Sequence, residues 1–406
     1  MVEKSFDKFI EEMLNLGDDY SIETIWKDDD QKVIHIHIKY NKDYYLENGI
    51  RFKLYDLAPE RMWQHLGWFQ YQCYIFCRLP RFINKENKVK TVRSTFANPM
   101  KGYTLLFAYY IIEALKKIKV QQTTADLYKT SSYIVRTIME EAVENGLVKR
   151  GYVKCLENIS IDEKAYIKGH NYATILGDYD SNCVIDMVEG RKGEHVKLLF
   201  YCVTGQEQQP QIKRVNIDMW EAYINTMKEI APIAIQVHDK FHLVGKLSEA
   251  IDKTRKKEVK TEPLLIKNKY TVLKNEKNRT EKQQTSFELI NQANLKTAQA
   301  WRIRENFKDI FSFNILEQIN EAYEKWVKDA IESGIKYVKD VVETFKRHKQ
   351  GVMNAFITKT TSGKHENLNG RIQSVLAKAR GFRNFDRFRI NILFHFSNLN
   401  LLPLKN

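Results

Sequence analysis

The stretch that decides the fold is "ENISIDEKAYI", residues 157–167, where a helical pattern gives way to alternating apolar and polar residues. Two similar runs follow after short turns, "NYATILGDYD" at 171–180 and "CVIDMVEGRK" at 183–192. Short alternating runs separated by turn residues are typical of neighbouring antiparallel strands. The sequence therefore predicts a three-stranded meander over residues 157–192.

Helical and strand-like segments alternate after this meander. The helical ones are "GEHVKLLFYCVTG", "MWEAYINTMKEIAP" and "KFHLVGKLSEAIDKTRKK", and the strand-like ones are "QIKRVNID" and "IAIQVHD". The resulting order, βββαβαβα, is typical of α/β proteins in which three antiparallel strands are followed by parallel crossovers. A mixed sheet is therefore expected in this part of the chain.

Three aspartates lie within or at the ends of these strands: Asp162 in the first, Asp218 after the fourth and Asp239 after the fifth. Open α/β sheets bind ligands beyond the carboxyl ends of their strands, so these carboxylates are candidate metal ligands. Phosphodiester chemistry commonly uses Mg²⁺ ions held by several carboxylates. Asp218 and Asp239 also precede helices, and a simple N-cap role is the alternative for each.

One acid heads a basic C-terminal stretch, "KHENLNGRIQSVLAKARGFRNFDRFRINIL", residues 364–393. The acid is Glu366, and the bases that follow it are Arg371, Lys378, Arg380, Arg383, Arg387 and Arg389. Apolar residues at helical spacing predict a helix from about 364 to 380; they are Leu368, Ile372, Val375, Leu376 and Ala379. Glu366 lies off this apolar stripe, so we expect it at the edge of the sheet, with Arg371, Lys378 and Arg380 facing outward.

Residues 103–150 read as three helices with short turns. Ser131 or Ser132 is expected to cap the third helix, and Gly146 to end it. This spacing fits a helix-turn-helix, and it fits a plain helical bundle equally well.

The first hundred residues contain a short helix and "KVIHIHIKY", whose alternation predicts a strand with His35 and His37 on one face. Cys73 and Cys77 are separated by three residues and have no second cysteine pair nearby. A structural zinc site normally needs four ligands, so we do not expect zinc here.

The composition indicates a polyanionic partner. Lys and Arg total 65 against 51 Asp and Glu, for a formal net charge of +14. No apolar run is long enough to cross a membrane, and the five cysteines lack the spacing of a secreted disulfide scaffold. The cysteine content fits a reducing cytoplasm best.

Residues 255–355 are predicted to be helical, polar and basic. They include Trp301 and Trp326, which could stack on an unpaired base but are expected to be buried.

Four motifs in this order resemble the ISL-three group of insertion-sequence transposases, over about residues 100–400. They are "SIDE" at 160–163, "NIDMW" at 216–220, "VHDKFHL" at 237–243 and "SGKHENLNGRIQSVLAKARGFRNF" at 362–385. Each motif is weak alone, but their combination and order are specific.

The resemblance implies a ribonuclease-H-like catalytic domain that is interrupted by a helical insertion and preceded by a helix-turn-helix. It also implies a DDE metal triad, carried here by Asp162, Asp218 and Glu366, with Asp239 as the competing second aspartate. Members commonly begin with a zinc module containing two cysteine pairs, and this chain departs from that pattern. The expected cofactor is Mg²⁺, for which Mn²⁺ would substitute.

The expected domains are a small α+β DNA-binding module at 1–100, a helix-turn-helix at 101–150, the catalytic core at 151–250 and 356–406, and the insertion at 251–355. The expected function is that of a DNA transposase, which binds double-stranded terminal inverted repeats and cleaves and joins DNA as a homodimer on paired ends. Its expected DNA-binding residues are Ser131, Ser132, Arg136, Arg371, Lys378, Arg380, Arg383 and Arg387. The alternatives are a nuclease of the same fold and a non-catalytic regulator derived from a transposase.

Overall fold

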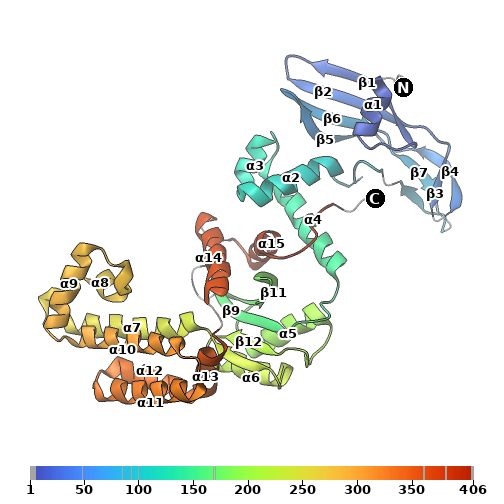
Figure 1. Ribbon diagram of the computed structural model, residues 1–406. Helices are drawn as coiled ribbons and strands as arrows, with labels where there is room; N and C mark the ends of the chain where they lie inside the picture. The colour runs from blue at the N-terminus through green and yellow to red at the C-terminus, as the bar shows by residue number, and fades with distance from the viewer. Residues whose placement is uncertain are drawn as a thin grey trace. The chain divides into compact units, whose positions relative to one another are not determined.

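The computed structural model describes residues 6–47, 49–84, 86–92, 94–98, 100–167, 169, 171–359, 362–379 and 382–403, with the backbone alone at 47 and 362–367 (Figure 1). The chain forms two compact units. The first unit comprises residues 1–151, 393–395 and 399–406, and the second comprises 152–392 and 396–398. Among the described residues, no helix combines the length and the apolar character needed to cross a membrane.

The first unit begins with two four-stranded sheets. The first sheet has the order β1-β2-β6-β5 and the second β3-β4-β7-β8. Their bounds, with the preceding helix, are α1 (Phe6–Met13), β1 (Tyr20–Asp28), β2 (Val33–Tyr40), β3 (Tyr44–Glu47), β4 (Ile50–Leu57), β5 (Arg61–Trp68), β6 (Tyr71–Cys77), β7 (Pro80–Ile83) and β8 (Val89–Thr91). The alternation of "KVIHIHIKY" explains β2, because Ile34, Ile36 and Ile38 are buried while the histidines between them lie on the other face.

Three helices complete the first unit: α2 (Leu105–Ile118), α3 (Gln121–Leu127) and α4 (Ser132–Arg150). Ser131 is the N-cap of α4, and its hydroxyl accepts a hydrogen bond from the backbone N–H of Ile134. The prediction that Gly146 ends this helix is wrong, because α4 continues to Arg150 and its C-cap is Gly151, whose φ is +59°. Gly146 is buried inside α4, where an added Cβ would lie 3.0 Å from Cβ of Leu399.

The second unit is built on a five-stranded mixed sheet of order β11-β10-β9-β12-β13. The meander β9-β10-β11 is antiparallel, whereas β12 runs parallel to β9 and β13 runs parallel to β12. The elements follow the predicted order; they are β9 (Asn158–Ile167), β10 (Asn171–Asp178), β11 (Cys183–Glu189), α5 (Gly193–Thr204), β12 (Arg214–Ile217), α6 (Glu221–Ile230), β13 (Ile235–His238) and α7 (Lys240–Glu258). The predicted class, a mixed α/β sheet with a large helical part, is confirmed.

Helices cover both faces of this sheet (Figure 1). Helices α5 and α6 pack on one face, where Ile159, Ile161 and Leu176 join Phe200 and Met227 in a buried core. The two C-terminal helices, α14 (Ser362–Lys378) and α15 (Phe385–Phe396), lie on the other face. Because side chains alternate along a strand, Asp162 projects from β9 toward the face that α14 covers.

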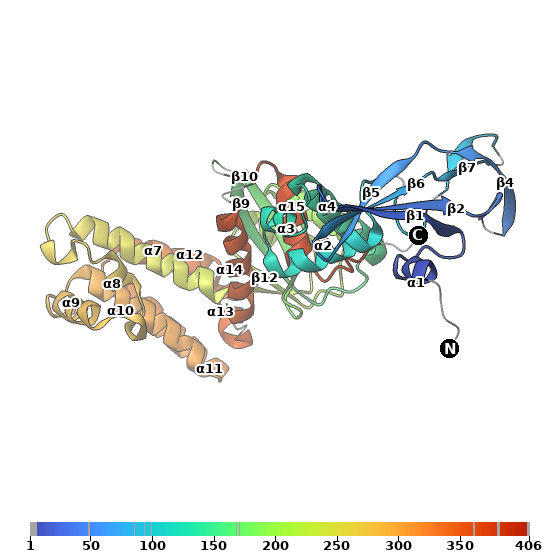
Figure 2. The same ribbon diagram turned by 90° about the horizontal axis from the view of Figure 1, so that it is seen from above.

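A helical insertion extends away from the sheet (Figure 2) and packs against β13. It follows α7 and consists of α8 (Lys269–Leu273), α9 (Glu281–Gln292), α10 (Lys296–Asp309), α11 (Leu316–Glu332), α12 (Lys336–Arg347) and α13 (Lys349–Thr358), with short 3₁₀ turns at Pro263–Leu265, Glu276–Asn278 and Ile310–Ser312. Its apolar core is continuous with Val237 of β13. This shared core holds the start of α7 close to the end of β13.

Candidate active site

Asp162, in the middle of β9, and Asp218, just after the end of β12, lie side by side. Strands β9 and β12 are parallel, and Ile161 pairs with Ile217 in their register. Asp162 and Asp218 are the next residue on each chain. The parallel pairing therefore brings together two carboxylates that are 56 positions apart in the sequence. Local sequence patterns alone do not predict that they are neighbours.

The side chain of His242 lies between these two carboxylates. Its Nε2 is 3.8 Å from Oδ1 of Asp162, and its Nδ1 is 3.9 Å from Oδ2 of Asp218. His242 is in the first turn of α7. The sequence contained this histidine in the "VHDKFHL" motif, but no periodicity or spacing assigned it to the site. A single imidazole that faces both carboxylates shows that they converge on one small volume.

The carboxylate of Asp162 is buried and incompletely satisfied. Its side chain is only 7% exposed, and Oδ1 accepts a hydrogen bond of 2.8 Å from the backbone N–H of Glu163. Oδ2 is buried and has no hydrogen-bond partner among the side chains that the structure describes; Nζ of Lys164, at 3.5 Å, gives it an ion pair only. A buried carboxylate oxygen without a hydrogen bond is unfavourable, and a bound cation would compensate for it. The residues present therefore fit a hard divalent cation, which prefers oxygen ligands.

Asp218 and Asp239 have different local roles. Asp239 is the N-cap of α7, and its Oδ1 accepts a hydrogen bond of 2.7 Å from the N–H of Phe241. Asp218 does not cap α6, whose N-cap is Trp220; its Oδ1 accepts from the N–H of Met219 and its Oδ2 faces His242. The helix-capping alternative therefore describes Asp239 and not Asp218.

Glu163 is an acidic neighbour that the sequence reasoning did not single out. Burial raises the pKa of its carboxyl group; Arg191 opposes the rise, and the carboxylates of Asp162 and Asp218 add to it. Nη1 of Arg191 lies 3.8 Å from Oε1 of Glu163. This corner of the sheet thus gathers negative charge from two strands and places one arginine beside it.

Helix α14, which contains Glu366, covers the face of the sheet that carries Asp162. A Cβ added to Gly177 would lie 2.6 Å from Oγ of Ser160 and 3.8 Å from Cδ2 of Leu368, so α14 packs directly on these strands. The side chain of Glu366 lies outside the described part of the structure. Among the side chains that are described, no group of three or more His, Cys, Asp or Glu residues is placed to hold a metal ion.

Comparisons with known proteins show the family of this chain. The family model for the ISL3 type, described as "Transposase", matches residues 159–392, which include the whole mixed sheet, the insertion and α14. The chain belongs to the ISL3 group of insertion-sequence transposases. The transposase for insertion sequence element IS1557 of Mycobacterium tuberculosis is 24% identical over 358 residues, which cover 80% of this chain and 79% of that protein. The transposase for IS1001 of Bordetella parapertussis is 22% identical over 400 residues, covering 95% and 97%. Membership of this transposase group implies a DNA-processing enzyme.

The described basic residues of the transposase around α14 and α15 are of two kinds: some are accessible to solvent, and others contact protein groups. Lys378 and Arg383 are exposed and Arg387 is half-buried, whereas Arg380 lies outside the described residues. The expectation that Arg371 faces outward is wrong in part, because its guanidinium stacks on the ring of Phe396, 4.8 Å from the centroid. Arg389 forms a bidentate ion pair with Asp186 of β11, with both N–O distances at 2.8 Å.

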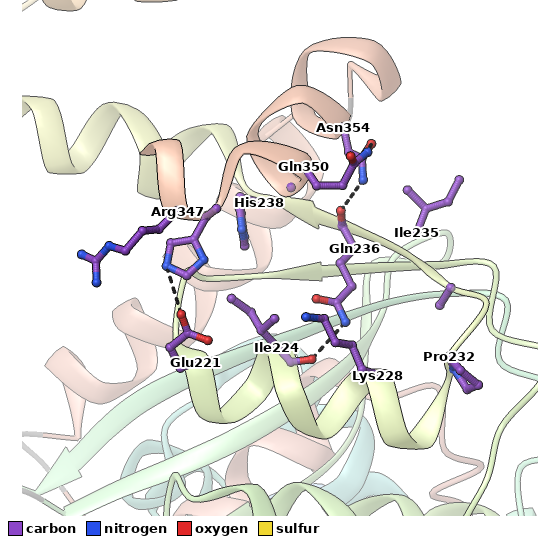
Figure 3. A pocket seen from close by; sticks show the side chains of 13 residues that line it. Glu221, Ile224, Lys228, Pro232, Ile235, Gln236, His238, Arg347, Gln350 and Asn354 are labelled. Carbon is purple, nitrogen blue, oxygen red and sulfur yellow. Dashed lines mark hydrogen bonds and ion pairs between the residues drawn. The ribbon is translucent and has the colours of Figure 1, made fainter. Parts of the chain in front are cut away.

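A groove of about 580 Å³ lies beside the candidate active site of the transposase, between α6, β13 and α13 (Figure 3). Its lining includes Glu221, His238 and His348, and Nε2 of His348 lies 3.6 Å from Oε1 of Glu221. Nδ1 of His238 donates a hydrogen bond to the carbonyl of Ile217, just before Asp218. None of the three candidate aspartates lines this groove. Its residues therefore contribute to the packing beside the carboxylates and are not candidate ligands.

In the first unit of the transposase, the residues that the sequence singled out make contacts within that unit. Ser132 donates a hydrogen bond to Gln122 of α3, and the guanidinium of Arg136 lies 5.1 Å from the ring centroid of Tyr133. Cys73 and Cys77 are buried in the sheet core, where burial raises the pKa of each thiol to about 12. Thiols that resist ionisation in this way are poor metal ligands.

Proposed function

We propose that this protein is a DNA transposase that cleaves DNA at terminal inverted repeats and joins the ends to a target. The observation that carries the proposal is the convergence of Asp162 and Asp218 on His242, with one buried oxygen of Asp162 that receives no hydrogen bond from the described residues. The metal ligands in this proposal are Asp162, Asp218 and Glu366. Leu368, two residues after Glu366, packs against Gly177 of β10, which supports this assignment.

The protein residues have separate tasks in the proposed reaction. Asp162 and Asp218 would hold one Mg²⁺ ion between adjacent strands, and Glu366 would close the ligand set from α14. Mg²⁺, when bound, activates the attacking oxygen and stabilises the departing one. His242 would orient both carboxylates, because it is the described side chain that faces both of them. Mn²⁺ would substitute, since it also binds carboxylate oxygens. We propose that the core belongs to the ribonuclease-H-like class, which the strand order and the parallel crossovers support.

Recognition of DNA is assigned to two surfaces. In the first unit, α3 and α4 are joined by a four-residue turn at 128–131, which is the spacing of a helix-turn-helix, and we propose that α4 enters the major groove. In the second unit, Lys378, Arg383 and Arg387 would contact phosphates, which position DNA without reading its sequence. Two ends must be brought together for joining, so we propose a homodimer on paired ends.

A joining assay tests this function. The protein is incubated with Mg²⁺, precleaved transposon ends and a supercoiled target plasmid, and products are separated by electrophoresis. A transposase gives plasmid molecules covalently joined to the end DNA. Nicked plasmid without joined product would identify a nuclease, and specific binding of the ends without any cleavage would identify a DNA-binding regulator; either result contradicts the proposal.

A further inference from the structure

The second unit contains three tryptophans with different environments. Trp326 is buried and its indole N–H donates to the carbonyl of Ile303, which confirms the expectation of burial. Trp301 is half-buried and donates to the carbonyl of Lys274. Trp220 is 46% exposed and lies two residues after Asp218. The indole available to a ligand near the carboxylates is therefore Trp220, and the two tryptophans of the insertion serve its packing.

A constrained turn places Arg191 next to this indole. Gly190 has a φ of +102°, its N–H donates to the carbonyl of Tyr172, and its own carbonyl accepts from Oγ1 of Thr174, both at 2.7 Å. A Cβ at Gly190 would lie 2.5 Å from the ring of His195. The turn thus requires glycine, and it fixes the backbone from which Arg191 projects.

Arg191 links two aromatic rings to the acidic corner of the sheet. Its guanidinium carbon lies 4.3 Å from the ring centroid of Tyr172 and 5.6 Å from that of Trp220. The same guanidinium lies 3.8 Å from Glu163, whose backbone N–H is bonded to Asp162. Tyr172, Arg191 and Trp220 therefore form a platform that borders both segments carrying the candidate metal ligands. We call these three residues the aromatic platform.

Resting on the proposed function, we propose that the aromatic platform binds one unpaired nucleobase of the DNA end, beside the phosphodiester that reacts at Asp162 and Asp218. An exposed indole offers a flat surface on which any base can stack, and an arginine next to it contributes both charge and hydrogen-bond donors. Taking one base out of the duplex also frees the adjoining backbone to enter an active site. The platform would hold that base while the neighbouring phosphate is at the carboxylates.

Matched DNA ends test the proposal without cleavage. In buffer without divalent metal, dissociation constants are measured for ends that carry an unpaired base or an abasic nucleotide, at each position beside the scissile phosphate in turn. The wild-type protein should bind the unpaired base more tightly than the abasic nucleotide at one position, by about 5-fold to 150-fold, the range expected for one stacked base. Trp220→Ala should bind the two ends equally, and Trp220→Phe should restore the preference.

Tyr201→Ala is the control, because Tyr201 is 53% exposed on α5 and its loss should leave the preference unchanged. A base preference that persists in Trp220→Ala overturns the proposal. So does a wild-type protein that binds and joins ends but shows no base preference at any position, and in that case the transposase function still stands. Failure to bind or join transposon ends at all would instead overturn the proposed function, and the aromatic platform proposal with it.

Discussion

Gly351 in α13 lies directly against the imidazole of His238 at the end of β13. A Cβ at Gly351 would lie 2.4 Å from both Cδ2 and Nε2 of that ring. His238 is itself buried and bonded to the carbonyl of Ile217. This contact therefore sets how closely the helical insertion approaches the strand that precedes α7 and His242.

Gly351→Ala should destabilise the protein by about 1–3 kcal/mol, because the buried ring of His238 cannot move away without breaking its hydrogen bond. Urea unfolding at pH 7 measures this. Gly245→Ala is the control, since an added Cβ there meets no atom within 4 Å; in helix α7 it should stabilise by about 0.5–1 kcal/mol. Equal effects of the two substitutions would show that the close contact is absent.

Acid should weaken the fold through His238. Burial lowers the pKa of His238 to about 4, below its ordinary value of 6.5. Between about pH 6.5 and pH 4 the unfolded chain binds a proton that the folded chain does not, so the free energy of unfolding falls as the pH falls through this window. At pH 5 the loss from this one residue should be about 2 kcal/mol relative to pH 7.

The measurement compares urea unfolding of the wild type and of His238→Asn at pH 7 and pH 5. The asparagine side chain can still donate to Ile217 but does not titrate, so the pH dependence should become smaller. His65 and His395, whose pKa values burial also lowers to about 4, are present in both proteins and cancel. An unchanged pH dependence in His238→Asn would refute the assignment.

The ion pair between Arg389 and Asp186 should anchor α15 to the sheet. Asp186 is 6% exposed, so Arg389→Met would remove the guanidinium from a buried carboxylate and should cost about 3–5 kcal/mol. The double variant Asp186→Leu with Arg389→Met should recover most of this stability, because no buried charge is then left. Thermal or urea unfolding reports the difference, and equal stability of the single and double variants would contradict this prediction.

Lys378 should act on DNA and not on folding. Lys378→Gln removes an exposed positive charge, so affinity for transposon ends should fall and the slope of log affinity against log salt should decrease by about 1. The unfolding free energy should stay within about 0.5 kcal/mol of the wild type. Lys228→Gln, a change of another exposed lysine on α6, should leave the slope unchanged. An identical effect of both substitutions would mean that the charge of Lys378 acts without a defined contact.

Much of the fold followed from patterns that are local in the sequence. Alternation predicted β9, β10 and β11, and the change to helical spacing predicted α5, α6 and α7, because side-chain burial in these elements repeats every two or 3.6 residues. The prediction for Gly146 was also based on a local pattern, and it was wrong. Glycine often ends a helix, but here Gly146 lies inside α4, next to Leu399 from the far end of the chain.

The candidate site could be predicted only in outline. Strand ends pointed to Asp162, Asp218 and Asp239, but only the parallel register and the N-cap hydrogen bond of Asp239 distinguish the last two. The position of His242 between two carboxylates and the ion pair of Arg389 with Asp186 depend on contacts between segments far apart in the sequence. No periodicity encodes such contacts, since they arise when helices pack on the finished sheet.

The most direct test of the central claim is the Mg²⁺-dependent joining of precleaved ends by four variants: Asp162→Asn, Asp218→Asn, Asp239→Asn and Glu366→Gln. Asparagine caps helices as well as aspartate does, so Asp239→Asn should keep most of the wild-type rate. The other three should each lose at least about a hundredfold, since changes even in residues that only support metal ligands cost 10-fold to 100-fold. Rapid joining by Asp218→Asn together with its loss in Asp239→Asn would contradict the assignment.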